Sequence, residues 1–325
     1  MMHRFGGWLV RQYNVLARGE LTFAPESIAI AVTIPMPGRK RKQKPEVSII
    51  GSGRLGTVLA VALASRGYSI RSLVARRAQK ARHAATLLDA EVQVLAAKQL
   101  RLLQPADVFL ITVPDDQIAG VAAELNRLEF TGTALHTSGA LSAEVLAPLR
   151  ERGWRIGSVH PLMSVSDARE GDAALRGGYW SVEGDKSVLS LAKTIVSDLG
   201  GKSFSIRSED KPLYHAAAVM VSGNVTALFD VALEMLVECG LTRKTARSVL
   251  LPLIASAVHN LETKDPARAL TGTFSRGDLE TVKRHLAALK NKDLADALEL
   301  YRLLGQRSLK LTKKHPQITQ ILKSV

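Results

Sequence analysis

Between residues 45 and 208, short apolar runs alternate with stretches in which apolar residues recur every three or four positions. Short apolar runs predict buried strands, and the wider spacing predicts helices. We expect strands at 47–50, 68–75, near 92, 108–113, 133–137, 155–159, 179–182 and 203–206, with helices at 54–66, 78–88 and 97–103. Such alternation predicts an α/β domain with a parallel sheet and right-handed crossovers.

The pattern changes after residue 208, where the rest of the chain is predicted to be helical. Residues 213–237 carry Ala, Val, Leu and Met on several helix faces, and 250–261 are similar, so these helices should be buried rather than lie at a surface. A small helical domain cannot bury so much apolar surface by itself. We therefore expect contact with the sheet domain and with a second subunit, in a homodimer. The alternative is a monomer with a large interface between its two domains.

The first 44 residues differ from both regions. They contain apolar residues at helical spacing between arginines, and then a basic stretch at 39–44. We expect a poorly ordered extension (1–44), or an over-extended start with Met36 as the true beginning. The alternative is a contact with a membrane or a partner. The predicted domains are therefore the extension, an α/β domain at 45–206 and a helical domain at 207–325.

Composition narrows the class of protein. No apolar run approaches the ~20 residues that cross a bilayer, and Cys239 is the only cysteine, which excludes an intrachain disulfide. We expect a cytoplasmic protein with no membrane partner. The net charge of +14 is uneven, since residues 1–45 hold eight Lys or Arg and two Glu. We expect no nucleic-acid partner, because no continuous basic face is evident beyond residue 45.

A glycine-rich turn follows the first strand, in the segment VSIIGSGRLGTVLA. Gly51 permits the tight turn, Gly53 allows a pyrophosphate to approach the backbone, and Gly56 allows the helix to pack on the sheet. The amides at the helix start favour an anion. We expect a Rossmann dinucleotide-binding domain in which the cofactor contacts Gly51, Ser52, Gly53, Arg54, Leu55 and Gly56. The alternative is a tight turn that binds nothing.

The end of the second strand indicates the cofactor. The sequence there is LVARRAQK, without the acidic residue that would bind the ribose 2′-hydroxyl of NAD. Arg76 and Arg77 are placed to pair with a 2′-phosphate, which favours NADP over NAD. Two solvated arginines are the alternative. Val113 and Pro114 end the fourth strand, at the edge of the sheet where ligands gather, whereas Asp115 and Asp116 are expected to cap the next helix.

Six segments occur in an order that resembles a known group of proteins. The chain resembles oxidoreductases in which a Rossmann-like domain precedes a helical domain of otherwise unknown function. The resemblance covers nearly everything from Pro45 onward and rests on GSGRLG, ITVPDDQI, LHTSGALS, SVHPLMSVSD, KPLYHAAAVMVSGN and ALTGTFSRGDLETVKRHL. More distantly, the layout is similar to pyrroline-5-carboxylate reductase, ketopantoate reductase and the 6-phosphogluconate dehydrogenase group, which implies a helical domain of the 6-phosphogluconate dehydrogenase C-terminal type.

The resemblance also implies a pocket. Its residues are Ser138 and Gly139, His160 and Pro161, Lys211, His215, Asn224 and the turn 271–278. We expect Ser138 to contact the cofactor, and His160 and Arg276 to contact the substrate, the arginine through a carboxylate. Lys211, His215 and Asn224 are the catalytic candidates, because reduction of C=O or C=N needs a proton donor.

These candidates have structural alternatives. His215 could be a satisfied interdomain histidine, His160 could simply end a strand, and Asp278 reads as an N-cap in a structural turn. Asn224 lies nine residues past His215, about 180° around an ideal helix, so the two share one stripe only if the helix bends. This departs from the Lys-x-x-x-Asn pair of hydroxyacid reductases and leaves the proton donor open. No histidines stand at metal-ligand spacing, and we expect no metal.

Three functions are compatible with these features. The first is an NADP-dependent oxidoreductase that transfers a hydride between NADPH and a small keto or imino acid in an interdomain cleft. The second is a non-catalytic NADP-binding sensor or regulatory protein. The third, a nucleic-acid binder, would act through the basic extension and would show salt-sensitive binding that is lost without residues 1–44.

Overall fold

The computed structural model describes residues 43–165, 173, 175–312 and 315–324. The extension predicted at 1–44 therefore lies outside the described residues, apart from its last two. Of these, Lys44 donates a hydrogen bond from Nζ to Asp198 Oδ2 at 2.9 Å and lies over the ring of Tyr68.

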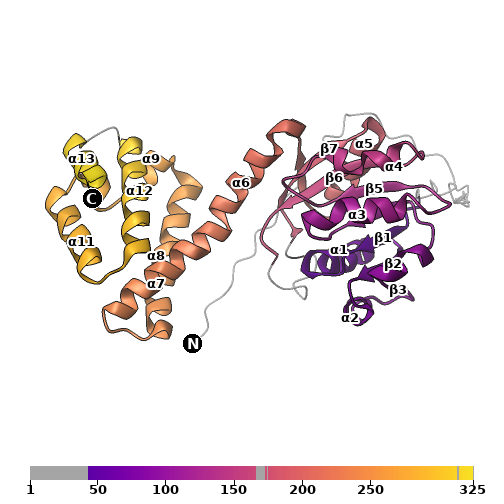
Figure 1. The fold of residues 1–325 in the computed structure, drawn as a ribbon, viewed down its shortest axis with the longest axis horizontal. Helices are drawn as coiled ribbons and strands as arrows, with labels where there is room; N and C mark the ends of the chain where they lie inside the picture. Colours follow the sequence, from indigo (N-terminus) through magenta and orange to yellow (C-terminus); the bar gives the residue numbers. More distant parts are fainter. Residues whose placement is uncertain (1–42, 166–172, 174, 313–314, 325) are drawn as a thin grey trace, which may run out of the picture. The chain divides into compact units, whose positions relative to one another are not determined.

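Eight strands form one sheet in the order β3-β2-β1-β4-β5-β6-β7-β8 (Figure 1). Every neighbouring pair is parallel except β6 and β7, which are antiparallel. The expected parallel sheet is thus confirmed for most of its width, and the strand pattern did not predict the reversed pair. The strands are β1 Val47–Ile50, β2 Ile70–Ala75, β3 Gln93–Ala96, β4 Val108–Ile111, β5 Thr133–His136, β6 Arg155–Leu162, β7 Tyr179–Gly184 and β8 Lys202–Phe204.

Helices cover both faces of this sheet, because the central strands are apolar on both sides. One buried cluster joins the sheet to α1 Arg54–Ser65, α2 Ala78–Ala85 and α5 Lys186–Asp198. A second cluster joins it to α3 Asp115–Leu125, α4 Ala147–Arg150 and the 3-10 turn η1 Ala97–Leu102. The domain is therefore doubly wound, which agrees with the predicted Rossmann domain. The 3-10 turn η2 Ala143–Leu146 leads into α4.

Beyond β8 the chain is largely helical. The 3-10 turn η4 Ser208–Asp210 precedes α6, and Pro212 lies in the first helical turn, where its missing N–H costs no hydrogen bond. A third apolar cluster unites the last helices around Val282, Leu286 and Ile318. The helices are α6 Lys211–Val221, α7 Gly223–Glu238, α8 Arg243–Thr263, α9 Pro266–Ala269, α10 Thr273–Arg276, α11 Leu279–Asn291, α12 Ala295–Thr312 and α13 Pro316–Ser324.

Candidate active site

The turn between β1 and α1 uses its three glycines in different ways. Gly51 has φ +119°, and a Cβ there would lie 2.6 Å from the backbone of Thr112 at the end of β4. A Cβ on Gly56 would collide with the carbonyl oxygen of Gly51. Around Gly53, by contrast, the nearest atom to a Cβ would be 3.9 Å away. Gly51 and Gly56 are thus required by packing, whereas Gly53 borders open space.

Some backbone amides of this turn form hydrogen bonds within the protein, and others do not. The N–H groups of Gly51 and Ser52 both donate to the carbonyl of Val74 at 2.8 Å, which fixes the turn against the end of β2. The amides of residues 54–56 have no acceptor among the residues that the structure describes. They stand at the positive end of the α1 dipole, which favours an anion. The free amides and the open space at Gly53 fit a pyrophosphate.

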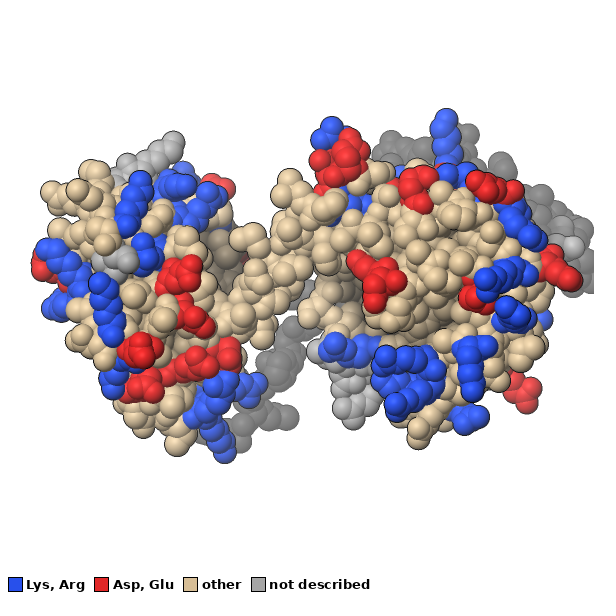
Figure 2. Space-filling view, viewed as in Figure 1, with Lys and Arg blue, Asp and Glu red and all other residues tan. Residues whose placement is uncertain are grey.

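Arg76 and Arg77 directly follow β2, beside this turn. Both side chains are exposed, and within the described part of the chain neither forms an ion pair. Figure 2 shows lysines and arginines gathered over the region of α2, with few acidic residues among them. Two free guanidinium groups at this strand end can pair with a phosphate on the adenosine ribose.

Three other predicted cofactor contacts lie at the same edge of the sheet. Thr112 Oγ1 donates to the Gly51 carbonyl at 2.7 Å, so the following residues, half-buried Val113 and exposed Pro114, emerge next to the glycine turn. The Ser138 hydroxyl is engaged in its own loop: it donates to Asp115 Oδ2 at 2.8 Å and accepts from two backbone amides. Asp115 therefore holds this loop, and it forms no side-chain cap on α3.

Two pockets meet at the end of β6. One, of about 340 Å³, begins at Arg54 and Leu55 in the glycine turn and reaches His160. The other, of about 630 Å³, extends from His160 to α6 and the start of α7, where it is lined by His215, Ser222 and Thr226. The two share His160, Pro161 and Met163. A ligand bound at the glycine turn and a second ligand on α6 would consequently meet at His160.

His160 is held by a tyrosine that the sequence analysis did not single out. Its Nδ1 lies 2.7 Å from the hydroxyl of Tyr214, and the two rings are perpendicular, with centroids 5.5 Å apart. Burial, with His215 and Lys211 nearby, lowers the pKa of His160 to about 4, so the ring is neutral at pH 7. Burial raises the pKa of Tyr214 to about 12, which keeps its hydroxyl protonated.

His215 packs against the same histidine. The two rings are 5.6 Å apart and meet edge to face. Both rest on Gly139, where a Cβ would lie 2.5 Å from His215 Nδ1 and 2.7 Å from His160 Nε2. His215 Nδ1 is buried without a hydrogen-bond partner among the described residues. The glycine thus allows two imidazoles to approach each other at the wall of the pocket.

Lys211 is fully buried. Its Nζ donates to Ser158 Oγ at 2.6 Å and lies 3.2 Å from Glu183 Oε2, whose side chain is 12% exposed. Burial lowers the pKa of this ammonium, and the charge of Glu183 opposes that shift. The structure therefore places Lys211 behind the pocket wall, in an ion pair between the start of α6 and the sheet.

The two remaining candidates do not line either pocket. Asn224 is exposed in the first turn of α7, and the backbone breaks at Ser222 (φ −122°, ψ −83°), which supplies the bend that an ideal helix lacks. Arg276 is exposed at the end of α10, next to the turn at Gly277. Asp278 accepts a hydrogen bond from the Thr281 amide, so the predicted N-cap is confirmed.

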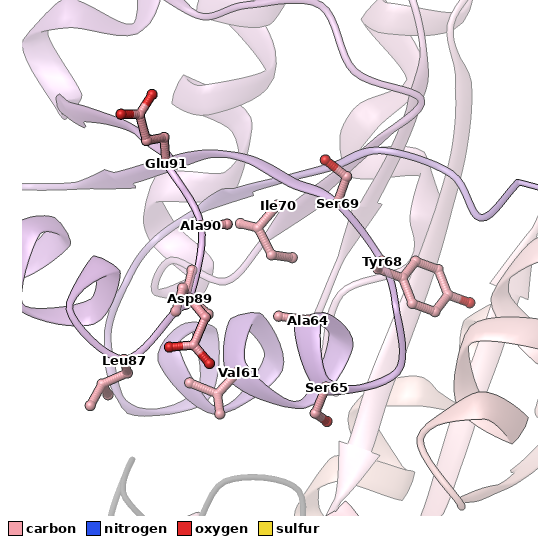
Figure 3. Close-up of a pocket in the computed structure, with 11 residues that line it drawn as sticks. Val61, Ala64, Ser65, Tyr68, Ser69, Ile70, Leu87, Asp89, Ala90 and Glu91 are labelled. Atoms are coloured by element: carbon pink, nitrogen blue, oxygen red, sulfur yellow. The ribbon is translucent and has the colours of Figure 1, made fainter.

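Another cavity lies away from this site. Figure 3 shows it between the end of α1 and the loop before β3, where Asp89 lies beside Val61 and the Glu91 carboxylate points away from the apolar side chains. It shares no residue with the glycine turn. Within the described ranges, no group of three or more His, Cys, Asp or Glu is placed to hold a metal ion.

Comparisons with known proteins agree with this architecture. Residues 34–161 match the family model of a Rossmann-like domain, and residues 178–308 match the model described as a domain of unknown function, DUF2520. The second match begins at residue 178, immediately before β7. No curated protein sequence matches the chain.

Solved structures show the same fold. A Bacteroides fragilis protein whose description gives NADP oxidoreductase as an expected activity is 24% identical, with a TM-score of 0.68 over 84% of this chain and 99% of its own. A Thermotoga maritima protein is 24% identical, with a TM-score of 0.64 over 82% and 98%. Plasmodium falciparum pyrroline carboxylate reductase, solved with NADP bound, is 16% identical, with a TM-score of 0.54 over 83% and 99%.

Proposed function

We propose that this chain, which carries a Rossmann-like domain followed by a DUF2520 domain, is an NADPH-dependent reductase of small keto or imino acids. Oxidoreductases are found among the proteins that share its fold. The observation that carries the proposal is the position of His160, which lines both the groove from the glycine turn and the pocket on α6.

The residues of the glycine turn fit the cofactor. In the proposal, the free amides of residues 54–56 bind the pyrophosphate, and Arg76 and Arg77 pair with the 2′-phosphate. Val113, Pro114 and the Ser138 loop border the same edge. When bound, NADPH supplies the hydride.

The side chains at the pocket wall supply the rest of the chemistry. Neutral His160 donates a hydrogen bond from Nε2 to the substrate oxygen or nitrogen as negative charge develops there. His215, which lines the same pocket, gives the proton. The substrate carbon gains the hydride and its heteroatom gains the proton of His215, so that C=O becomes CH–OH, or C=N becomes CH–NH. Lys211 positions α6 in this proposal and touches no substrate.

Arg276 and Asn224 line neither pocket, and in the proposal neither takes part in the transfer of the hydride or the proton. Arg276 is exposed and forms no ion pair with the residues that the structure describes, so it is a candidate to bind the substrate carboxylate. If it binds that group, Arg276→Ala raises the KM for the acid and leaves kcat nearly unchanged, because the interaction is the same in the ground state and the transition state. An unchanged KM removes Arg276 from the site.

The test of the function is turnover. The full chain is mixed with NADPH and a panel of keto acids and cyclic imino acids, and the loss of NADPH absorbance is followed. We expect oxidation with at least one substrate, and a loss of at least about 100-fold in kcat for His160→Gln. His285→Gln is the matched control, since His285 also pairs with a tyrosine, Tyr301, outside both pockets. Equal rates for the two variants would contradict the role of His160.

A redox sensor is the second candidate, and the network around Lys211 favours it in one respect. Lys211, the one lysine among the predicted proton donors, is buried against Ser158 and Glu183 and cannot reach a substrate in the pocket. A protein that binds the cofactor without catalysis needs no such donor. Tight NADPH binding with no oxidation by any substrate of the panel would support the sensor and reject the reductase.

We also propose that the protein is a cytoplasmic homodimer. Helix α8 is rich in apolar residues, yet Ala246 is its only buried residue; Leu253 is 67% exposed, and on α6 Leu213 and Val221 are 74% and 76% exposed. Ser208–Glu238 is long and apolar enough to cross a membrane by length and composition. Because the helix breaks at Ser222, and because apolar helices also pair in soluble dimers, we favour a second copy.

The dimer is tested by sedimentation. We expect twice the mass of the chain without detergent, and a shift toward the monomer in Leu253→Lys. A monomeric wild-type protein, or one that requires detergent, would contradict the homodimer.

A further inference from the structure

We propose that Tyr214 is a positioning residue that fixes the tautomer of His160, so that Nε2 of this histidine carries the proton and faces the pocket. The contact that carries the inference is the 2.7 Å hydrogen bond between Tyr214 Oη and His160 Nδ1. Its catalytic consequence rests on the proposed function, whereas the tautomer itself does not.

The direction of the hydrogen bond follows from the two groups. A protonated phenol is a good donor, and one nitrogen of a neutral imidazole must accept. When Tyr214 donates to Nδ1, the ring proton is left on Nε2. That nitrogen faces Gly139 and has no other partner among the residues described. It is open to the pocket. It is therefore the free donor at the junction of the two pockets.

Two rings pack against the tyrosine. Phe204 meets the Tyr214 ring edge to face with centroids 5.8 Å apart, and the His160 ring does so at 5.5 Å. The first turn of α6 is fixed by Lys211, three residues earlier on the same helix face, which reaches Ser158 on β6.

Helix and strand thus meet in a matched register. Ser158 and His160 lie on one face of β6, two residues apart, and receive Lys211 and Tyr214 from one face of α6. Glu183 on β7 neutralises Lys211, so the contacts of Lys211 join α6 to both β6 and β7. A helix slipped by one residue would lose both contacts together. In this proposal Lys211 acts on the tautomer of His160 indirectly: it fixes the first turn of α6 and so sets the distance from Tyr214 to His160.

The tautomer is measured directly by ¹⁵N NMR of the full chain with ring-labelled histidine, in which protonated and bare ring nitrogens give distinct signals. His160→Gln assigns the relevant pair. We expect one tautomer in the wild-type protein, with the proton on Nε2, and a mixture in Tyr214→Phe, which keeps the ring and removes the hydroxyl. We also expect kcat to fall about tenfold, with the KM for NADPH unchanged.

Tyr301→Phe is the matched control. Tyr301 makes the same contact with His285 Nδ1 at 2.8 Å, with rings 5.7 Å apart and nearly perpendicular, and lies in neither pocket at His160. This variant should alter the signals of His285 and leave His160 and kcat unchanged.

Two results would overturn the inference. One is a wild-type His160 protonated on Nδ1, a measurement that needs no variant. The other is a folded Tyr214→Phe protein in which the His160 tautomer is unchanged. If the tautomer behaves as expected but no substrate is reduced, only the proposed reductase fails.

Discussion

The buried pair of Lys211 and Glu183 allows a sharp prediction about stability. Lys211→Met keeps the volume of the side chain and removes its charge. The Glu183 side chain, which is only 12% exposed, is then left without its cation. Removal of one partner of a buried pair costs about 3–5 kcal/mol. Glu183 Oε1 still accepts hydrogen bonds from the Ala143 amide and the Ser208 hydroxyl, so we expect about 3 kcal/mol, the lower end.

Removal of both charges should recover most of this loss. In Lys211→Met with Glu183→Gln, the amide oxygen can still accept from Ala143 and Ser208, and no buried charge remains. We expect this double variant to lie within about 1 kcal/mol of the wild type. Lys283→Met is the control, because Lys283 pairs with Glu280 at 2.8 Å on the surface, where such a pair contributes about 0–1 kcal/mol.

The assay is urea unfolding followed by tryptophan fluorescence, since Trp154 and Trp180 are both buried in the sheet domain. The expected order of unfolding free energies is wild type, Lys283→Met and the double variant close together, and Lys211→Met clearly lower. If the double variant is as unstable as Lys211→Met, the uncompensated carboxylate is not the cause and the reasoning is refuted.

Three further predictions concern single features. Arg76→Ala with Arg77→Ala should weaken NADP binding about 10–100-fold and leave NAD binding nearly unchanged, as measured by calorimetry; an equal loss for both would contradict the 2′-phosphate role. Gly139→Ala should displace both imidazoles and reduce kcat about 100-fold or more, whereas normal turnover would show that the rings need not touch this residue. Burial lowers the pKa values of His136 and His160 to about 4, so the stability that each contributes is full above about pH 6.5 and falls by about 3 kcal/mol toward pH 4; an unfolding free energy that falls no less in His136→Gln than in the wild type would exclude the contribution of His136.

The glycine turn could be predicted because its information is local. The positive φ of Gly51 and the close approach of Gly56 to the Gly51 carbonyl arise within one strand-turn-helix unit, and the lack of an acidic residue after β2 is visible in the sequence. The contact of Gly51 with Thr112 comes from the end of β4 and appears only in the tertiary structure. The parallel pairing of most strands follows equally from the alternation of strands and helices. The direction of β7 does not, since an apolar run is the same in both directions.

The network at His160 could not be predicted in the same way. Lys211 has the chemistry of a proton donor, and only the tertiary structure shows that it is buried against Ser158 and Glu183. Tyr214 gave one usable signal, its position three residues after Lys211 on the same helix face. The angle calculated for Asn224 assumed an ideal helix, and the break at Ser222 removes that assumption.

The central claim is that the backbone at Gly53 receives the pyrophosphate of NADP, and calorimetry of matched glycine variants tests it most directly. A Cβ at Gly53 or at Gly120 on α3 meets no atom within 3.8 Å, so both Gly53→Val and Gly120→Val should fold. We expect NADP to bind the wild type and Gly120→Val alike, and at least about 100-fold more weakly to Gly53→Val, whose side chain would fill the space. A wild-type protein that binds neither NADP nor NAD, or a Gly53→Val protein that binds NADP as tightly as the wild type, would contradict the account.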